Sequence, residues 1–214
     1  MTSTRFSFDT IQNFDIHIAQ SIEGYSLLFK LIQRTATFFT KPNTNIIDIG
    51  CSTGILLESI KHPAQHKIGI DISTHLLPEN STEATYWNTD IRTTSLPKAN
   101  LILSIFTLQF INPEDRQPIL NKIYESLHEG GAFIWAEKTH HENGKIEQML
   151  TMSYYQHKRQ SFTAEQILDK EQDLRTQMTP NTSEQNLQLA RNAGFTQSTI
   201  LWKINQFEAW VHIK

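Results

Sequence analysis

The sequence predicts an α/β fold built on a doubly wound, seven-stranded and mostly parallel sheet. Short β-branched runs alternate with longer segments of helical spacing between residues 45 and 138, which implies parallel strands joined by crossover helices. Two further strand-like runs, 199–205 and 207–214, close the chain with only Gln206 between them. Because that link is too short for a crossover helix, the last strand is expected to run antiparallel. The length of 214 residues suits one domain, spanning 1–214.

The elements follow in order. Residues 8–40 have helical spacing, and the segment 1–42 is expected to form an N-terminal helical lid over the site. Strands are predicted at 45–50, 67–72, 84–91, 99–107 and 131–138. Helical spacing recurs at 52–62 and at 112–131, where Asn112 and Pro113 mark the start and Gly130 and Gly131 the end. Residues 139–180 are expected to form a helical insertion over the active site.

Composition excludes several classes of function. The formal net charge is −3, with 19 basic and 22 acidic residues and no run of Lys or Arg, so direct nucleic-acid binding is not expected. The single cysteine cannot form an internal disulfide, and the first residues lack the features of a signal peptide. No apolar run approaches the roughly 18 residues that a membrane span requires. The expectation is a cytoplasmic protein without a membrane segment.

The loop "DIGCSTG" at 48–54 follows the first predicted strand, where open parallel sheets bind their ligands. A dinucleotide fingerprint would need glycines at the positions of Ser52 and Ile55, so the spacing fails. A carboxylate at Asp48 would repel a pyrophosphate but can accept hydrogen bonds from an ammonium group. S-adenosylmethionine (SAM) carries such a group and has no phosphate. Gly50 is expected to leave room for this ligand.

Two further acids end the next strands. Asp71 is placed to accept both hydroxyls of a ribose, and Asp90 to meet the amino group of an adenine. Each acid alone is equally explained as a helix cap or turn former, and Gly50 and Gly54 as turn glycines. Taken together and in register, these residues predict SAM as the cofactor, and the pattern resembles the class I SAM-dependent methyltransferases. Cys51 is expected to be a packing residue rather than a nucleophile.

Longer stretches narrow the resemblance: "SIEGYSLLFKLI" at 21–32, "FTLQFINPEDRQPILNKIYESLHEGGAFIWAEK" at 106–138 and "LARNAGF" at 189–195. With "IDIGCS" they resemble the carboxy-S-adenosylmethionine synthases. The resemblance implies an enzyme that holds SAM and prephenate and captures a carbon dioxide unit from prephenate at the SAM methyl carbon. It also implies a homodimer, with a product that serves tRNA wobble-uridine modification by a partner enzyme. The predicted cofactor-binding residues are Tyr25, Asp48, Gly50, Cys51, Ser52, Gly54, Asp71, Ile72, Asp90, Ile91 and Ile105.

The chain departs from that family at two positions. Ile105 stands where the family has an Asn at the methionine end of SAM, and Glu171, after Lys170, stands where the family has an Arg that grips the new carboxylate. An acid at that position would repel the carboxylate. Arg175, one helical turn on, is the predicted substitute. The link 73–83 between the second and third strands is also shorter than the family's by about a helix.

The insertion holds "MLTMSYYQHKRQSF" at 149–162, whose aromatic residues are candidates for an acceptor pocket. The rings of Tyr154 and Tyr155 would attract a sulfonium methyl, and His157 would take a proton from a nucleophile. Alternatively, Met149, Met152 and Tyr155 pack as one helix face against the sheet and His157 is solvated. No metal is predicted, because the pair His140 and His141 lacks a third ligand at a supporting spacing.

Four functions remain open. The first is group transfer from SAM to a small molecule, most simply methylation, in which positioning supplies most of the catalysis. The second is carboxy-SAM synthesis from SAM and prephenate. The third is cyclisation of SAM to azetidine-2-carboxylate with release of methylthioadenosine, since Ile105 would tether the α-amine less. The fourth is a SAM-binding interaction protein without turnover. The predicted catalytic residues are Tyr154, Tyr155 and Arg175.

Overall fold

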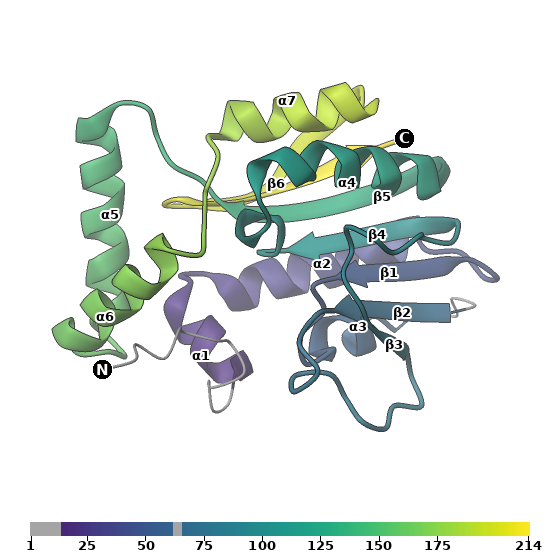
Figure 1. Cartoon of the computed structure of the whole chain (residues 1–214), viewed down its shortest axis with the longest axis horizontal. Coiled ribbons are helices and arrows are strands. Elements are labelled where there is room, and N and C mark those ends of the chain that lie inside the picture. The colour runs from purple at the N-terminus through teal and green to yellow at the C-terminus, as the bar shows by residue number, and fades with distance from the viewer. Residues whose placement is uncertain (1–13, 62–65) are drawn as a thin grey trace.

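A seven-stranded sheet forms the centre of the molecule (Figure 1). The computed structural model describes residues 14–61 and 66–214. The strands are β1 (Asn45–Ile49), β2 (His66–Asp71), β3 (Thr85–Asn88), β4 (Ala99–Ile105), β5 (Leu127–Lys138), β6 (Gln197–Ile204) and β7 (Phe207–Ile213). Their order is β3-β2-β1-β4-β5-β7-β6, with β1 to β5 parallel and β7 antiparallel to both of its neighbours. The predicted fold class is confirmed.

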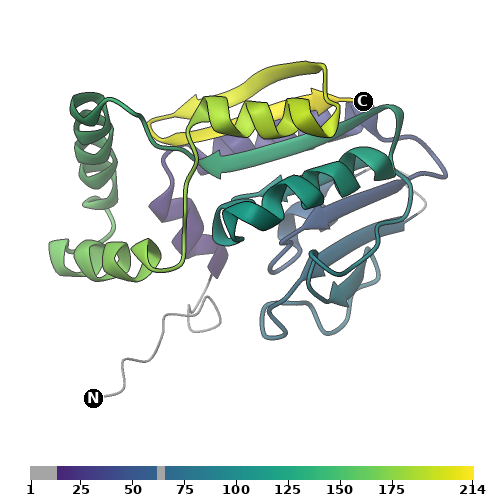
Figure 2. The same cartoon turned by 45° about the horizontal axis from the view of Figure 1, so that its top comes forward.

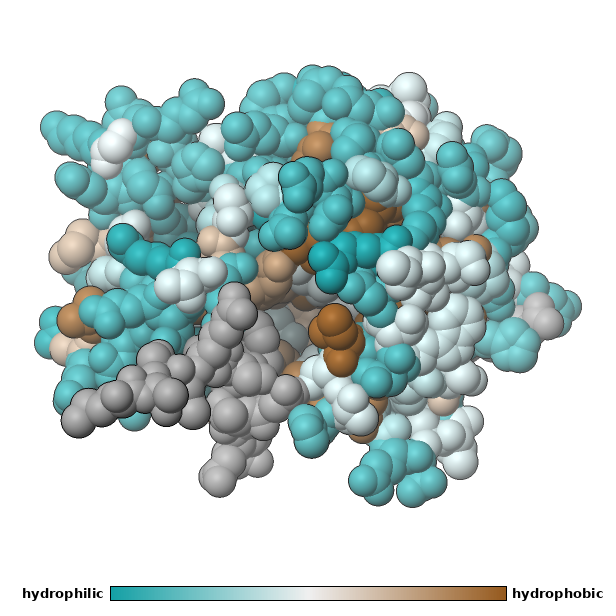
Figure 3. Space-filling model, in the orientation of Figure 1, coloured by the Kyte–Doolittle hydropathy of each residue, from teal (hydrophilic) through white to brown (hydrophobic). Residues whose placement is uncertain are grey.

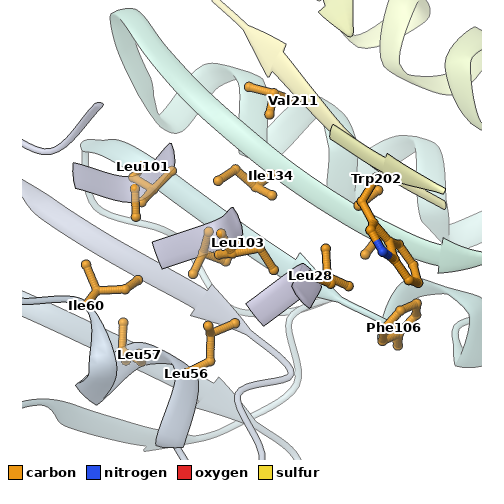
Figure 4. Packing of buried hydrophobic residues seen from close by; sticks show 14 of the residues in the cluster. Leu28, Leu56, Leu57, Ile60, Leu101, Leu103, Phe106, Ile134, Trp202 and Val211 are labelled. Carbon is orange, nitrogen blue, oxygen red and sulfur yellow. The ribbon is translucent and has the colours of Figure 1, made fainter. Parts of the chain in front are cut away.

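Helices cover both faces of the sheet. On one face α2 (Tyr25–Phe39) and α3 (Ile55–Ser59) pack against the sheet, and on the other α4 (Pro113–Ser126) and α7 (Ser183–Ala193) do so. Figure 4 shows Leu28 of α2 and Leu57 of α3 beside Leu101 and Leu103 of β4. The intervening Ile102 belongs to the opposite core, because successive side chains of a strand point to opposite faces.

Three helices lie beyond the carboxyl ends of the parallel strands: α1 (Phe14–Ser21), α5 (Gly144–Lys158) and α6 (Ala164–Arg175) (Figures 1 and 2). The last two come from the insertion at 139–180. They extend the molecule past the end of the sheet. The space between them and the strand ends is where a ligand of an open α/β sheet is expected.

The helix α2 is a layer of the fold rather than part of a lid. Its residues Leu28, Ile32 and Ala36 are at most 1% exposed and pack against the sheet. Within the described residues 14–42, the space at the strand ends is bordered by α1, by Ile22 and by Tyr25 at the start of α2. The predicted lid over 1–42 therefore reduces to these elements among the described residues, and the part of that prediction that falls on residues 1–13 lies outside them.

The boundaries of two elements differ from the sequence prediction. The helix α4 begins at Pro113 after Asn112, as expected, but ends at Ser126 rather than at the glycine pair. The strand β5 then starts at Leu127, which pairs with Ala99 before the register shifts. Gly130 lies inside this strand, and its backbone N–H donates to the carbonyl of Lys214. Pairing with distant strands thus overrides the local helical pattern.

The edge of the sheet formed by β2 and β3 is simpler than in a regular doubly wound fold. Residues 72–84, all of them described, link β2 to β3 through turns without a helix, as the short link predicted. The strand β3 ends at Asn88 rather than at 91, because Asp90 starts a turn whose carbonyl accepts from the N–H groups of Thr93 and Thr94. One edge of the sheet is therefore formed by a short strand and an open loop.

Most of the surface in Figure 3 is hydrophilic, with hydrophobic residues gathered near the centre of that face. None of the helices in the described ranges, 14–61 and 66–214, combines the length and the apolar character needed to cross a bilayer. The longest of them, α2 and α5, have 15 residues each, fewer than the roughly 20 that span a hydrocarbon core.

Candidate active site

A cavity of about 580 Å³ opens at the carboxyl ends of the parallel strands. It is bounded by α1, by the loop after β1, by the ends of β2, β4 and β5, and by α5 and α6. Its volume lies within the range of small-molecule sites. It also extends across the ends of several strands, so different elements supply chemically different walls.

One side of the cavity, here named the acidic wall, consists of Asp48, Asp71 and Asp90. Asp48 is only 3% exposed, and burial, reinforced by the charge of Asp71, raises the pKa of its carboxyl to about 7. A buried carboxyl of this kind is stabilised in its charged form by a cation. The ammonium group of SAM is such a cation, so this residue fits the predicted cofactor.

Asp71 organises the loop that follows β1. Its Oδ2 accepts the backbone N–H of Ser52 at 2.8 Å, and its Oδ1 accepts the backbone N–H of Ser73 at 2.8 Å. A carboxylate has about four lone-pair sites, so two backbone bonds leave capacity for ribose hydroxyls. Asp71 therefore fits its predicted ligand role and fixes two loops as well.

Asp90 is already paired within the protein. The guanidinium of Arg92 donates to both of its oxygens, with Nη2 at 2.6 Å from Oδ2. These hydrogen bonds lower the pKa of the Asp90 carboxyl. Arg92 also lines the cavity and reaches Asp115 at 3.4 Å. The sequence analysis missed this arginine, although its place two residues after a predicted ligand was a usable signal. Contact of Asp90 with an adenine stays a prediction.

The two glycines of the loop make room for protein side chains. Both have a left-handed backbone with φ of +74°. A Cβ added to Gly50 would lie 2.1 Å from Oγ1 of Thr107, and one added to Gly54 would lie 2.0 Å from the hydroxyl of Tyr86. Only Gly50 lines the cavity. The expectation that Gly50 leaves room for the ligand stays a prediction. The structure gives a second reason for this glycine, because the close neighbour is Thr107, which donates to the carbonyl of Ile49 at 3.1 Å.

The remaining predicted cofactor residues all line the cavity: Tyr25, Cys51, Ser52, Ile72, Ile91 and Ile105. Cys51 is 6% exposed, and burial raises the pKa of its thiol, which keeps the thiol protonated and unreactive. Burial also raises the pKa of the Tyr25 phenol, with a smaller contribution from the charge of Asp15. The structure thus brings these residues together, while their contacts with a ligand stay predictions.

The helix α1 is tied to the loop after β1. Both carboxylate oxygens of Asp15 lie within reach of the hydroxyl of Thr53, which donates at 2.9 and 3.0 Å. His17, two residues after Asp15, also lines the cavity. Burial and then the charges of Lys170 and Lys158 lower the pKa of its imidazole. The helix therefore closes one side of the cavity with a neutral histidine facing two cations.

The side opposite the acids, here named the lysine wall, consists of Lys138, Lys158 and Lys170. They come from the end of β5, the end of α5 and the middle of α6. The Nζ atoms of Lys138 and Lys158 lie 5.1 and 5.3 Å from the ring centre of Tyr154. Burial lowers the pKa of each ammonium group, that of Lys170 to about 8. The sequence analysis did not single out these residues, although Lys138 ends a predicted strand just as the acids do.

The three predicted catalytic residues are distributed unevenly. Tyr154 lines the cavity, is 5% exposed and packs edge-on against Phe207 at 5.2 Å. Tyr155 and Arg175 do not contribute to the lining. The side chain of Arg175 is 73% exposed, and its Nε lies 3.4 Å from Oε1 of Glu171. The catalytic roles of all three stay predictions. The cations that lie over the ring of Tyr154 are Lys138 and Lys158, not Arg175.

The alternative packing of α5 is wrong. Met149 and Met152 are 60% and 59% exposed, so they do not pack as a face against the sheet. His157 is half-buried rather than fully solvated. Within the described part of the chain, no three His, Cys, Asp or Glu side chains are grouped in a way that could hold a metal ion.

The sheet order, the reversed strand β7 and the cavity at the strand ends define a class I SAM-dependent methyltransferase fold. Residues 46–131 match a family model described as a methyltransferase domain. Human N-acetylserotonin methyltransferase in complex with SAM superposes with a TM-score of 0.63 at 16% identity, over 94% of this chain and 55% of that one. The chain thus spans just over half the length of that enzyme. The SAM-dependent methyltransferase SibL gives a TM-score of 0.59 at 15% identity, over 95% of this chain and 60% of that one.

Curated relatives identify the family within this class. Carboxy-S-adenosyl-L-methionine synthase of Staphylococcus epidermidis is 32% identical, over 97% of this chain and 95% of the relative. The synthase of Campylobacter lari is 31% identical, over 98% and 95%, and that of Klebsiella pneumoniae is 31% identical, over 92% and 85%. The chain belongs to the carboxy-S-adenosyl-L-methionine synthase family. It is a SAM-dependent enzyme of the methyltransferase fold.

Proposed function

We propose that this chain forms carboxy-SAM from SAM and prephenate. Prephenate loses carbon dioxide and hydroxide as its ring becomes aromatic, which leaves phenylpyruvate. The hydroxide takes a proton from the SAM methyl group to give water, and the deprotonated methyl carbon bonds to the carbon dioxide. One observation carries the proposal: the cavity continues past the acidic wall, across the ends of β4 and β5, to α5 and α6. A second small molecule therefore has room beside the reactive end of the cofactor. The relatives named carboxy-S-adenosyl-L-methionine synthase, at 31–32% identity over nearly the whole chain, support this reaction.

The residues of the chain bind SAM, orient it and enclose the site. Asp48 pairs with the ammonium group of SAM, and Asp71 accepts hydrogen bonds from its ribose while it fixes the loop at Ser52. Bound SAM supplies a methyl group on a positively charged sulfur, which is activated both for transfer and for loss of a proton. The helix α1, tied down through Asp15 and Thr53, limits the access of water. Orientation and exclusion of water are the main requirements of such a reaction.

Methyl transfer to a small acceptor is the second candidate. It is favoured by Ile105 and Glu171, because the family's residues for the methionine end of SAM and for the new carboxylate are absent at these positions. The same cavity and the same acidic wall serve this reaction, since only the identity of the second substrate differs.

Product analysis tests the proposal. The purified chain is incubated with SAM, with and without prephenate, and the products are identified by mass, with Asp71→Ala as a control impaired in cofactor binding. Carboxy-SAM that appears only with prephenate supports the proposal. S-adenosylhomocysteine together with a methylated acceptor supports the second candidate. Methylthioadenosine without an acceptor, or unchanged SAM, contradicts both.

A further inference from the structure

Lys138 and Lys158 of the lysine wall carry positive charge, and in the described part of the chain the acids that act on it lie outside the cavity lining. Among the described residues, the acids in the lining are Asp15 of α1 and the three members of the acidic wall. Asp173, which also lies outside the lining, raises the pKa of Lys170. Glu171 raises the pKa of Lys138 and of Lys158, but its Oε1 lies 3.4 Å from Nε of Arg175. Glu147 accepts hydrogen bonds from the side chain of Gln206 and from the backbone of His141.

The two walls are separated across the sheet. Lys138 ends β5, which is two places from β1 and its Asp48 in the order β1-β4-β5. Asp48 is level with Ile134 of β5, four residues before Lys138. With neighbouring strands about 4.8 Å apart and a rise of about 3.3 Å per residue, the backbones of Asp48 and Lys138 are on the order of 15 Å apart. An ammonium group held at Asp48 and a carboxylate held at the lysines would therefore lie on opposite sides of Ile105 of β4, which also lines the cavity.

Burial of several ammonium groups in one wall is unfavourable unless an anion joins them. Lys158 is only 4% exposed. Beyond the effect of burial, the charge of Lys138 lowers the pKa of Lys158, and the charge of Lys158 lowers the pKa of Lys170. Aromatic contact with Tyr154 offsets part of this effect, since the face of an aromatic ring attracts a cation. A bound carboxylate would offset much more of it.

We infer that the lysine wall is the carboxylate receptor of this chain, in place of an arginine at the position of Glu171 and in place of Arg175. Lys138 and Lys158 hold a carboxylate of the second substrate and then the carboxylate of carboxy-SAM, and Lys170 completes the positive field. The inference rests on the proposed function only for the identity of the anion. Since lysines are point charges rather than planar forks, the receptor recognises charge more than orientation.

This assignment reverses one consequence of the sequence analysis. If only the sequence is considered, the acid at Glu171 would repel the new carboxylate, which predicts that carboxy-SAM binds no better than SAM. In the structure the carboxylate of Glu171 lies beside Arg175 and outside the lining, while three lysines reach the cavity. A preference for carboxy-SAM over SAM is therefore expected.

Binding calorimetry with carboxy-SAM and SAM as probes tests the inference. The wild-type chain should bind carboxy-SAM at least about tenfold more tightly than SAM, as one charge-assisted pair provides. Lys158→Met and Lys138→Met should each reduce this ratio about fivefold or more, and the double variant should abolish it. Affinity for SAM should stay within about twofold, because SAM lacks the additional carboxylate on the methyl carbon that this wall is proposed to hold. Lys158→Arg should retain the preference.

Lys145→Met is the matched control, because Lys145 lies in the first turn of the same helix α5 and is exposed. It should leave both affinities unchanged. Thermal melting establishes that each variant is folded; if Lys158→Met fails to fold, Lys138→Met and Lys158→Arg decide. The inference is overturned if the wild type shows no preference, if the methionine variants keep it, or if Lys145→Met loses as much.

The outcome is separable from that of the proposed function. If the chain converts SAM and prephenate to carboxy-SAM while the methionine variants keep the binding preference, only the receptor assignment is wrong. If the preference exists and disappears in the methionine variants, but no carboxy-SAM is formed from prephenate, the receptor assignment stands and only the reaction is wrong.

Discussion

The acidic wall and the lysine wall face the same cavity but are built differently. The acids follow successive strands, and two of them are fixed by hydrogen bonds from the protein, Asp71 to the backbone of Ser52 and Asp90 to the side chain of Arg92. The lysines come from a strand and two helices of the insertion, and two of them stand over one tyrosine ring. A substitution of Asp71 or Asp90 is therefore expected to disturb both ligand binding and loop order, whereas one in the lysine wall should mainly disturb binding.

The largest effect is expected from Asp71→Ala. Binding of SAM should weaken by about 2–4 kcal/mol through the loss of charge-assisted hydrogen bonds. The melting temperature should fall too, because the N–H groups of Ser52 and Ser73 lose their acceptor. Calorimetry and thermal melting measure the two effects, with Glu129→Ala, exposed at the far end of β5, as control. Unchanged affinity would show that the second strand does not present its acid to the cofactor.

Gly50→Ala tests how far the loop after β1 depends on the absence of a side chain beside Thr107. The added Cβ meets the side chain of Thr107 on a backbone with φ of +74°, so the free energy of unfolding should fall by about 1–3 kcal/mol. Thr107→Ala removes two of the three closest atoms, so the same substitution should be less destabilising in that background. Denaturant titration of the four proteins measures this coupling. Gly144→Ala, which meets nothing within 4 Å, is the control.

Equal destabilisation in the two backgrounds would contradict the role given to Thr107. It would leave the left-handed backbone as the whole cause, since that strain is independent of the neighbouring side chain.

Asp48 predicts how the affinity for SAM depends on pH. Burial raises its pKa from 3.8 to about 7, so in this interval the free folded protein binds a proton that the cationic ligand must displace. Affinity should therefore rise from pH 5.5 to about 7, by up to about tenfold per pH unit, and then level off. Calorimetry across pH 5.5–7.5 measures this slope. In Asp48→Asn the affinity should be lower and nearly independent of pH; a slope that survives the substitution would assign the proton to another group.

The pH dependence that Asp48 gives to the stability of the free protein has the opposite sign. Because the folded state binds this proton more tightly than the unfolded state does, the free energy of unfolding should decrease as the pH rises from about 4 to 7. Asp48→Asn should remove that part of the decrease.

The smallest effect is expected from Arg175→Ala. The side chain is 73% exposed and pairs with Glu171 outside the cavity lining, and such exposed pairs contribute little. Affinity for carboxy-SAM should change by less than about twofold. A loss of tenfold or more, with the methionine variants of the lysine wall unaffected, would restore Arg175 as the carboxylate receptor and would make the two walls less distinct than described.

The acidic wall could be predicted from the sequence because its geometry follows from topology alone. Parallel strands end at one edge of a sheet, so acids that end successive strands must converge, and Asp48, Asp71 and Asp90 do line one cavity. The direction of β7 followed equally from the short link at Gln206. Such inferences depend only on strand order and connection length.

The rest depended on contacts between distant segments. The end of α4 was placed too late because pairing of Leu127 with Ala99 replaces the helical pattern before the glycines are reached. The lysine wall was missed because helical spacing within 139–180 does not determine how α5 and α6 are turned toward the cavity. Lys138 could have been predicted, because it ends a parallel strand just as the acids do. In the sheet order, β5 lies on the other side of β4 from β1, β2 and β3, which places Lys138 across the cavity from the acids.

The contact between Asp15 and Thr53 has a kinetic consequence. Thr53 follows Ser52, whose backbone N–H donates to Asp71. The contact that holds α1 and the acid proposed to bind the ribose are therefore joined to the same two-residue segment. Apart from Ser21, no residue of α1 is fully buried, so its displacement exposes little surface compared with global unfolding. The dwell time of a bound cofactor is therefore expected to follow the opening frequency of this one helix, and Thr53→Val should shorten that dwell time in stopped-flow measurements more than it weakens equilibrium binding.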